Sequence, residues 1–156
     1  ERTFRRCKRY AREFRLGAPS LLFSGGPGLG KTFLSACIAR AVADSGFSVV
    51  YDTAGQLFDD FEAVKFGGDQ RDLTQKYLNC DLLIVDDLGT EMTTQFTQSV
   101  LYRVINDRLL QNRPMIVSTN LSDSALRQRY SPAIASRLLG AFEICLFLGQ
   151  DIRLMR

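Results

Sequence analysis

Glycine, lysine and threonine occur at the spacing of a phosphate-binding loop in residues 25–32, which read GGPGLGKT. The run matches G-x-x-x-x-G-K-[ST] at every fixed position, and it lies between a short apolar run and a helical pattern, the context in which this loop works. Because glycines lack a Cβ, backbone N–H groups can close around a phosphate, while the helix N-terminus adds positive potential. The pattern therefore predicts a nucleoside triphosphate site with Mg²⁺.

The residues of this loop are expected to divide phosphate and metal binding between them. Lys31 is expected to contact the β- and γ-phosphate oxygens as a point charge, and the Thr32 hydroxyl is expected to be a ligand of Mg²⁺. The residues that we expect to contact the nucleotide are Gly25, Gly26, Pro27, Gly28, Leu29, Gly30, Lys31, Thr32 and Phe33.

Two consecutive carboxylates, Asp86 and Asp87, end the continuous apolar run of residues 82–85. Such a run is typical of a parallel strand that is covered on both faces. We predict that Asp86 holds the metal ion and that Asp87 is the general base that polarises the attacking water; the alternative for Asp87 is a solvated acidic turn. Glu91 is a further candidate to orient the water or to contact a neighbouring subunit.

Polar residues also follow the next predicted strand, residues 115–118. Ligands of an open parallel sheet lie beyond the carboxyl ends of its strands, so Asn120 is expected to hydrogen-bond the attacking water or the γ-phosphate. Arg137 belongs to a predicted helix after that loop, away from the strand ends of its own subunit. We predict that it contacts the phosphate of a neighbour. The alternatives are a loop-capping asparagine and a surface arginine.

Alternating periodicities predict the elements that position these residues. Short apolar runs predict strands at residues 21–23, 48–51, 81–86, 115–118 and 142–148, and helical stripes lie at residues 4–14, 33–42, 100–109 and 131–138. A weaker helical pattern between Thr53 and Tyr77, broken by Gly67 and Gly68, predicts two helices and a mobile loop. Because the connections are too long for hairpins, the sequence predicts an α/β fold with a parallel sheet and helices on both faces.

Composition indicates one globular domain. Of the 156 residues, 46% are hydrophobic and 24% are charged, and no apolar run approaches the roughly 20 residues that cross a bilayer. Scattered cysteines without histidine argue against a zinc site or a disulfide framework and suit a reducing cytoplasm. The first 15 residues carry a charge of +5 against +3 for the whole chain, so the body is not basic. The chain does not begin with Met, and we expect it to be cut from a longer protein.

Two shorter patterns favour a different class of nucleotide hydrolase. Residues 86–89 read D-x-x-G and residues 120–123 read N-x-x-D, which together with the phosphate-binding loop are similar to a GTPase set. The match is poor because Leu121 stands where the guanine-reading motif normally has lysine, and because the two patterns lie close together in the chain. ATP is therefore the preferred nucleotide.

The order of these motifs resembles the AAA+ ATPases of the DnaC/DnaI/IstB group, the bacterial replicative helicase loaders and their transposition relatives. The resemblance assigns Walker A to the glycine-rich loop, Walker B to Asp86 and Asp87, and sensor I to Asn120. It assigns the arginine finger to Arg137 and sensor II to Arg153. The runs that carry it are residues 21–35 (LLFSGGPGLGKTFLS), 81–91 (DLLIVDDLGTE), 117–121 (VSTNL) and 136–138 (SRL).

The resemblance also implies an architecture and a function. For the P-loop core (residues 17–156) the resemblance implies strand order 5-1-4-3-2, and charge and periodicity predict a basic N-terminal helix before it (residues 1–16). As a departure from the family, we expect the helical lid to be minimal or absent. The function is that of a cytoplasmic helicase loader that does not bind membranes. Its subunits would assemble head to tail when ATP is bound, and its nucleotide state would control its assembly on the replicative helicase and on single-stranded DNA. Asp87 stands where many members have glutamate, which implies slow hydrolysis. The alternatives are an IstB-like transposition helper and a nucleotide-gated binding module with negligible turnover.

DNA binding has two candidate segments. Members of the group contact single-stranded DNA with an extra helix after the second strand, here residues 53–67, and the alternative is a helix packed on the core. The basic N-terminal helix, with Arg5, Arg6 and Arg9, is the second candidate. The side chains that residues 53–67 offer for base stacking and phosphate contact are Phe58, Phe61, Lys65 and Phe66.

Overall fold

Parallel strands form one five-stranded sheet in the order β2-β3-β4-β1-β5, which is the implied order 5-1-4-3-2 counted from the other edge. The computed structural model describes residues 1–67 and 73–150. All neighbouring strands in these ranges are parallel, and the three central strands are almost entirely buried. The strands are β1 (Leu21–Ser24), β2 (Val49–Thr53), β3 (Leu82–Leu88), β4 (Met115–Thr119) and β5 (Glu143–Leu146).

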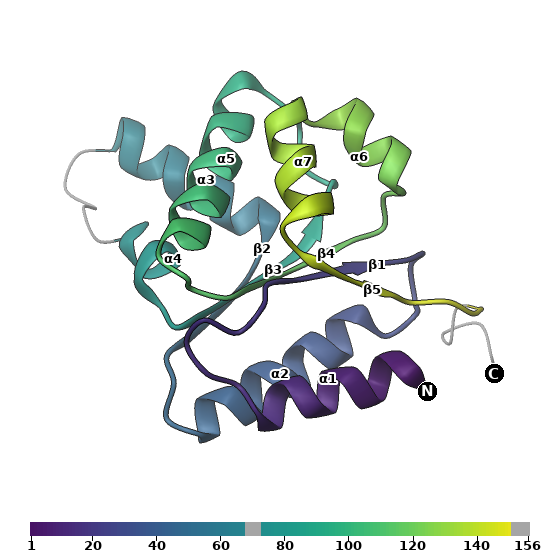
Figure 1. The fold of residues 1–156 in the computed structure, drawn as a ribbon. Coiled ribbons are helices and arrows are strands. Elements are labelled where there is room, and N and C mark those ends of the chain that lie inside the picture. Colours follow the sequence, from purple (N-terminus) through teal and green to yellow (C-terminus); the bar gives the residue numbers. More distant parts are fainter. Residues whose placement is uncertain (68–72, 151–156) are drawn as a thin grey trace.

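Helices cover both faces of this sheet (Figure 1), which confirms the predicted α/β architecture. The helices α1 (Arg2–Arg12) and α2 (Lys31–Asp44) pack on one face. The other face carries α3 (Ala54–Phe66), α4 (Gln75–Asn79), α5 (Gln95–Leu110), α6 (Asp123–Arg129) and α7 (Pro132–Gly140).

Alternation along the strands builds one apolar layer under each set of helices, because successive side chains point to opposite faces of a sheet. Ile84 of β3 packs in the layer beneath α1 and α2, together with Ile38 and Val42. Its neighbour Val85 packs in the opposite layer with Leu101. The continuously apolar sequence of β3 is thus used on both faces.

The structure corrects several predicted boundaries. The N-terminal helix ends at Arg12 rather than at residue 16, and Phe14 is buried from the turn that follows. Strand β3 continues two residues beyond Asp86, whereas β5 is shorter than predicted. Helix α6 was not predicted, since its seven residues are too few to show a helical period. The predicted mobile loop after Gly67 lies largely outside the described residues.

A buried arginine lies at the end of the sheet where the parallel strands begin, which we call its amino edge; the carboxyl edge is the end where they finish. Arg108 of α5 is 0% exposed, and its guanidinium donates to the carbonyl oxygens of Tyr77 (3.0 Å), Cys80 (2.9 Å) and Pro114 (2.7 Å). These carbonyls belong to the segments that lead into β3 and β4. The guanidinium therefore satisfies buried backbone acceptors where the two strands begin.

Candidate functional site

The phosphate-binding loop joins the end of β1 to the start of α2. Gly28 and Gly30 have φ angles of 71° and 90°, which glycine adopts without the steric cost of a Cβ. The buried Lys31 is the first residue of α2, and its ammonium group donates to the carbonyl oxygens of Gly25 (2.6 Å) and Gly26 (2.5 Å). The lysine charge is thus held at the loop, beside a helix N-terminus that favours a bound anion.

Asp86 lies at the centre of a set of hydroxyl donors. Its carboxylate accepts hydrogen bonds from Thr32 Oγ1 (2.9 Å), from the Tyr51 hydroxyl (3.1 Å) and from Ser118 Oγ. Burial, followed by the charge of Asp86, raises the pKa of Tyr51, so its hydroxyl stays protonated and continues to donate. Tyr51 of β2 and Ser118 of β4 were missed by the sequence analysis, because nothing in their local pattern links them to a carboxylate on β3.

Asp87 has a different environment, although it is the next residue. A β-bulge between Val85 and Leu88 interrupts the pairing of β3 with β4, and Asp87 adopts a left-handed φ of 56°. Its N–H donates to Ser118 Oγ (3.1 Å), and its side chain is exposed. The bulge thus turns one carboxylate inward and the other outward. A non-glycine residue in this conformation is strained, and such strain is concentrated at functional sites.

A pocket of about 570 Å³ lies where these elements meet, at the carboxyl edge of the sheet. It brings together the phosphate-binding loop, the exposed Asp87 and Asn120, which follows β4. Thr90 also lines the pocket and was not predicted. The predicted residues Gly25 and Gly26 lie outside the pocket lining. A Cβ on Gly25 would come within 2.3 Å of the Phe147 carbonyl oxygen, so the segment that follows β5 requires this glycine. The residues of the loop and of the start of α2 that line the pocket are Pro27, Gly28, Leu29, Gly30, Lys31, Thr32 and Phe33.

Comparison with known proteins agrees with this geometry. Residues 11–143 match the family described as IstB-like ATP binding protein. The chain belongs to this family. It is 25% identical over 122 residues to the replicative helicase loader DnaC of Escherichia coli K12, covering 76% of this chain and 50% of that protein. The DnaC protein of Buchnera aphidicola subsp. Schizaphis graminum is 24% identical over 135 residues, covering 85% and 55%. The IstB-like chain thus spans about half the length of these relatives.

Solved structures show the same fold. The crystal structure of the DnaC helicase loader has a TM-score of 0.85 at 21% identity, covering 94% of this chain and 89% of that chain. AMPPCP-bound DnaA from Aquifex aeolicus has a TM-score of 0.78 at 22% identity, covering 91% and 44%. The IstB-like chain therefore has an AAA+-type fold. No helix in residues 1–67 and 73–150 is long and apolar enough to cross a membrane.

One predicted residue of this IstB-like domain, Arg137, lies away from the pocket. Arg137 of α7 packs over the ring of Tyr102, with 4.7 Å between the guanidinium carbon and the ring centroid, and donates to Asn106 Oδ1 (3.0 Å). It is not among the described residues that line the pocket. Arg153, the predicted sensor II residue, lies outside the described residues.

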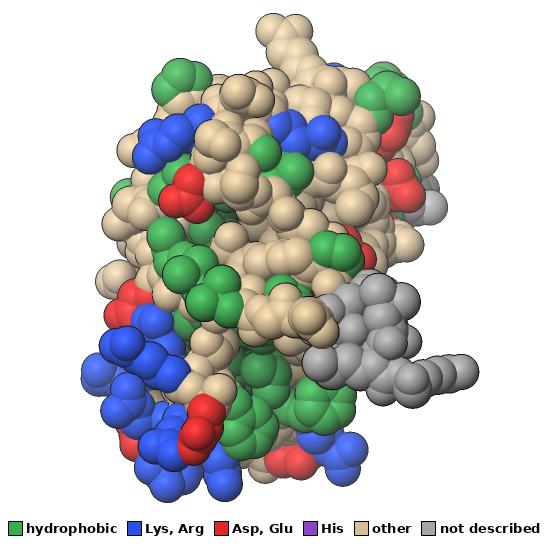
Figure 2. Space-filling model, turned by 90° about the vertical axis from the view of Figure 1, so that its right-hand side faces the viewer, with side chains coloured by type: hydrophobic (Ala, Val, Ile, Leu, Met, Phe, Trp, Pro, Cys, Tyr) green, Lys and Arg blue, Asp and Glu red, His purple; other side chains and the backbone are tan. Residues whose placement is uncertain are grey.

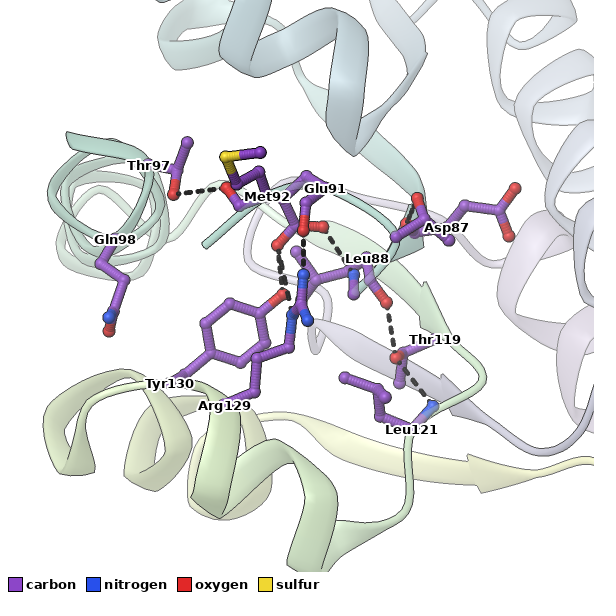
Figure 3. A network of polar contacts seen from close by, with 12 residues as sticks. Asp87, Leu88, Glu91, Met92, Thr97, Gln98, Thr119, Leu121, Arg129 and Tyr130 are labelled. Carbon is purple, nitrogen blue, oxygen red and sulfur yellow. Dashed lines mark hydrogen bonds and ion pairs between the residues drawn. The ribbon is translucent and has the colours of Figure 1, made fainter. Parts of the chain in front are cut away.

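The Glu91 prediction is wrong in both forms. Its side chain is 5% exposed, and its carboxylate accepts hydrogen bonds from the Gly89 N–H (2.8 Å) and the Tyr130 hydroxyl. A carboxylate that is buried and occupied in this way is available neither to the pocket nor to a neighbouring subunit. Glu91 instead joins two segments of the same chain, as Figure 3 shows.

The candidate DNA-stacking segment is divided between core and surface. Phe58 and Phe61 are buried in the apolar layer beneath α3, so they cannot stack on bases. Phe66 is 73% exposed, and the exposed Lys65 lies over its ring at 5.3 Å and over the ring of Phe96 at 4.7 Å. The alternative of a helix packed on the core therefore holds for two of the three aromatic side chains.

The pattern D-x-x-G has a structural explanation in this chain. Gly89 has a φ of 108°, and a Cβ on it would come within 2.6 Å of Leu121 Cδ1. Leu121 is partly buried and packs against the core, at the place where a guanine-reading motif would have lysine. Glycine at position 89 thus has a packing role beside Leu121 in the turn after β3.

Proposed function

We propose that this IstB-like domain binds ATP with Mg²⁺ and hydrolyses it slowly. The observation that carries the proposal is the convergence of Lys31, Asp87 and Asn120 on one pocket at a helix N-terminus. Thr32 and Asp86 fit a metal ion, since a hydroxyl and a carboxylate oxygen 2.9 Å apart are the hard donors that Mg²⁺ prefers. Bound there, Mg²⁺ would offset the negative charge of the phosphate oxygens.

The residues of the pocket then have separate roles. Lys31 binds the β- and γ-phosphate oxygens, and the backbone of the loop encloses them. Asp87, which is exposed in the pocket, accepts the proton of the attacking water, while Asn120 orients that water. The aspartate is one methylene shorter than the glutamate of many AAA+ proteins, so it reaches the water less well. Slow turnover suits a switch better than a motor.

No arginine lines the pocket within residues 1–67 and 73–150, so none of these residues offsets the charge of the transition state as an arginine would. Among the described residues that line it, Lys31 is the only cationic side chain. Arg137 is half-buried between α7 and α5, where its guanidinium donates to the Tyr102 hydroxyl (3.2 Å) and to Asn106 Oδ1 (3.0 Å). We infer that subunits stack head to tail and that Arg137 of one subunit completes the site of the next.

The similarity to proteins named replicative helicase loader DnaC supports a role in DNA replication, and we propose that this role is cytoplasmic. We propose that nucleotide state controls the assembly of this domain on a replicative helicase and on single-stranded DNA. Lys and Arg side chains gather at the lower left of Figure 2, over the region of α1, and Arg9 of that helix is exposed. Nucleic-acid phosphates are the chemistry that such a surface binds. An IstB-like helper in transposition is the alternative role.

Titration calorimetry with ATP and GTP in the presence of Mg²⁺ tests the nucleotide assignment. We expect ATP to bind and GTP to compete poorly. Equal affinities would overturn the ATPase proposal and favour a GTPase. ATP binding without phosphate release, in conditions where light scattering shows assembly, would instead identify a nucleotide-gated binding module with negligible turnover.

A further inference from the structure

Glu91 lies in a buried junction between the loop after β3 and the start of α7, and we call the set Gly89, Glu91, Arg129 and Tyr130 the Glu91 junction (Figure 3). One carboxylate oxygen accepts the Gly89 N–H at 2.8 Å, and the other accepts the Tyr130 hydroxyl. Arg129 Nε lies 3.9 Å from the same carboxylate, and the Arg129 guanidinium also donates to the Glu91 carbonyl oxygen. Both carboxylate oxygens are thus held by hydrogen bonds within the chain.

The inner end of the junction is the segment of residues 87–90, which begins with Asp87. Gly89 is two residues from Asp87, and Thr90 Oγ1 donates to the Asp87 carbonyl oxygen at 3.0 Å. On the next strand, Thr119 Oγ1 donates to the Leu88 carbonyl oxygen at 2.7 Å, and Thr119 directly precedes Asn120. A shift of Asp87 therefore moves the Gly89 N–H, one of the two donors that hold the Glu91 carboxylate.

The outer end of the junction is the helix that carries Arg137. Tyr130 directly precedes Ser131, which caps α7 and whose N–H donates to Gln98 Oε1 of α5 at 2.8 Å. Burial, followed by the hydrogen bond to Glu91, raises the pKa of Tyr130, so the hydroxyl remains a donor. Because α7 is a continuous helix from Pro132 to Gly140, movement at its first turn is transmitted to Arg137.

We propose that Glu91 is a positioning residue that couples the Asp87 loop to α7, so that nucleotide at the pocket sets the placement of Arg137 toward the neighbouring subunit. The inference rests on the proposed function. A buried carboxylate with two fixed partners cannot follow one segment without displacing the other, since leaving either donor unpaired in the interior is costly. A movement of Asp87 or Asn120 in the pocket should thus be accompanied by a movement of Arg137.

Hydrogen exchange with and without a non-hydrolysable ATP analogue and Mg²⁺ tests this coupling. In the wild type, we expect the analogue to slow exchange both in residues 87–91 and in the first turn of α7, where the Ala135 N–H bonds to the Ser131 carbonyl oxygen. In Tyr130→Phe, which removes only the hydroxyl, the loop response should remain, and the α7 response should fall about tenfold.

A second variant and a matched control separate coupling from stability. Glu91→Gln keeps the shape of the side chain but loses its charge, and we expect it to lower kcat several-fold while the Kd of the ATP analogue stays unchanged. Tyr10→Phe removes a hydroxyl that donates to the Pro19 carbonyl oxygen on the opposite face of the sheet. This control should leave both exchange responses at their wild-type size.

The outcomes distinguish the inference from the proposed function. No response in residues 87–91 of the wild type would overturn ATP binding at the pocket and the coupling with it. A normal loop response accompanied by an unchanged α7, or an α7 response that survives both Tyr130→Phe and Glu91→Gln, would overturn the coupling alone. A parallel fall of both responses in Tyr130→Phe and Glu91→Gln would also overturn it, because that result describes a general loss of structure.

Discussion

Polar side chains have different roles at the amino edge and at the carboxyl edge of the sheet. At the amino edge, Arg108 is completely buried and its guanidinium donates to backbone carbonyls of the segments entering β3 and β4. At the carboxyl edge, Asp87 and Asn120 are exposed and line a pocket beside the phosphate-binding loop. Both edges carry charged side chains, but Arg108 satisfies backbone carbonyls of its own chain, whereas Asp87 is exposed in a pocket.

This difference shows that charge alone does not identify a functional site in the chain. Arg108 lies away from the pocket and donates only to groups of the chain itself, so its removal should lower the free energy of unfolding. Asp87 is exposed in the pocket, so its removal should leave stability nearly unchanged. Substitutions at the two edges should therefore separate stability from nucleotide chemistry.

Lys31→Ala should have the largest effect on the carboxyl edge. Removing the cation that faces the phosphate oxygens leaves their charge uncompensated in a partly dry pocket, so ATP binding should be abolished, a loss of roughly 100-fold or more. Titration calorimetry measures this loss, and Lys65→Ala, at an exposed lysine of α3, is the matched control. Wild-type affinity in Lys31→Ala would remove the loop from the proposed site.

Asp87→Asn should separate chemistry from binding at the same edge. We expect the variant to bind ATP but to lose turnover by roughly 10² to 10⁴, since only the general base has been removed. Asp86→Asn should weaken Mg²⁺-dependent binding as well, because Asp86 is the carboxylate bonded to Thr32. Identical binding and rates in the two variants would show that the inward and outward carboxylates do not divide the work.

Arg108→Leu should affect the amino edge alone. The substitution removes the guanidinium donor from the buried carbonyls of Tyr77, Cys80 and Pro114, of which Pro114 keeps the Leu83 N–H, and it should lower the free energy of unfolding by about 3 kcal/mol. Denaturant titration measures the change, and Arg103→Leu, 59% exposed on the same helix, is the control. A loss of ATP affinity in the folded Arg108→Leu protein would contradict the separation of the two edges.

The α1 arginines should have the smallest effect, because they lie away from both edges. If α1 holds DNA, the triple substitution Arg5→Gln, Arg6→Gln and Arg9→Gln should flatten the salt dependence of single-strand affinity by about 0.7 units of slope per lost phosphate contact. Arg5 and Arg6 are paired with Glu1 and Glu143, so Arg9 should dominate the change. An unchanged slope would leave α1 as a solvated helix face.

Sequence reasoning succeeded where a short run of residues determines its own structure. The phosphate-binding loop was predicted because its spacing is local, and the helix that begins at Pro132 was predicted because Ser131 caps it. It failed for Glu91, whose partners lie up to 39 residues away in the chain. Periodicity also did not predict the order of the strands in the sheet. The resemblance to the DnaC/DnaI/IstB group predicted it. Contacts between distant segments depend on how the sheet is assembled, and local patterns do not record them.

The bulge at Asp87 illustrates the same limit within the site. Two adjacent aspartates after an apolar run indicated a metal ligand and a base, but nothing in the sequence predicted that Asp87 takes a φ of 56° or that Ser118 holds its N–H. Tyr51 and Ser118 became visible only when β2 and β4 were placed beside β3. The position of the two aspartates at the carboxyl end of β3 was thus predictable from the sequence, whereas the hydrogen bonds that hold them were not.

Mixing two inactive variants tests most directly that the carboxyl-edge pocket is an ATPase site completed by a neighbour. Arg137→Ala has an intact pocket and Lys31→Ala has an intact arginine, and such an arginine contributes roughly 10³ to 10⁵ in rate. We predict that the mixture recovers phosphate release that neither variant shows alone, because some interfaces then pair a working pocket with Arg137. Release that stays at the level of the separate variants, while light scattering confirms assembly, would contradict this claim.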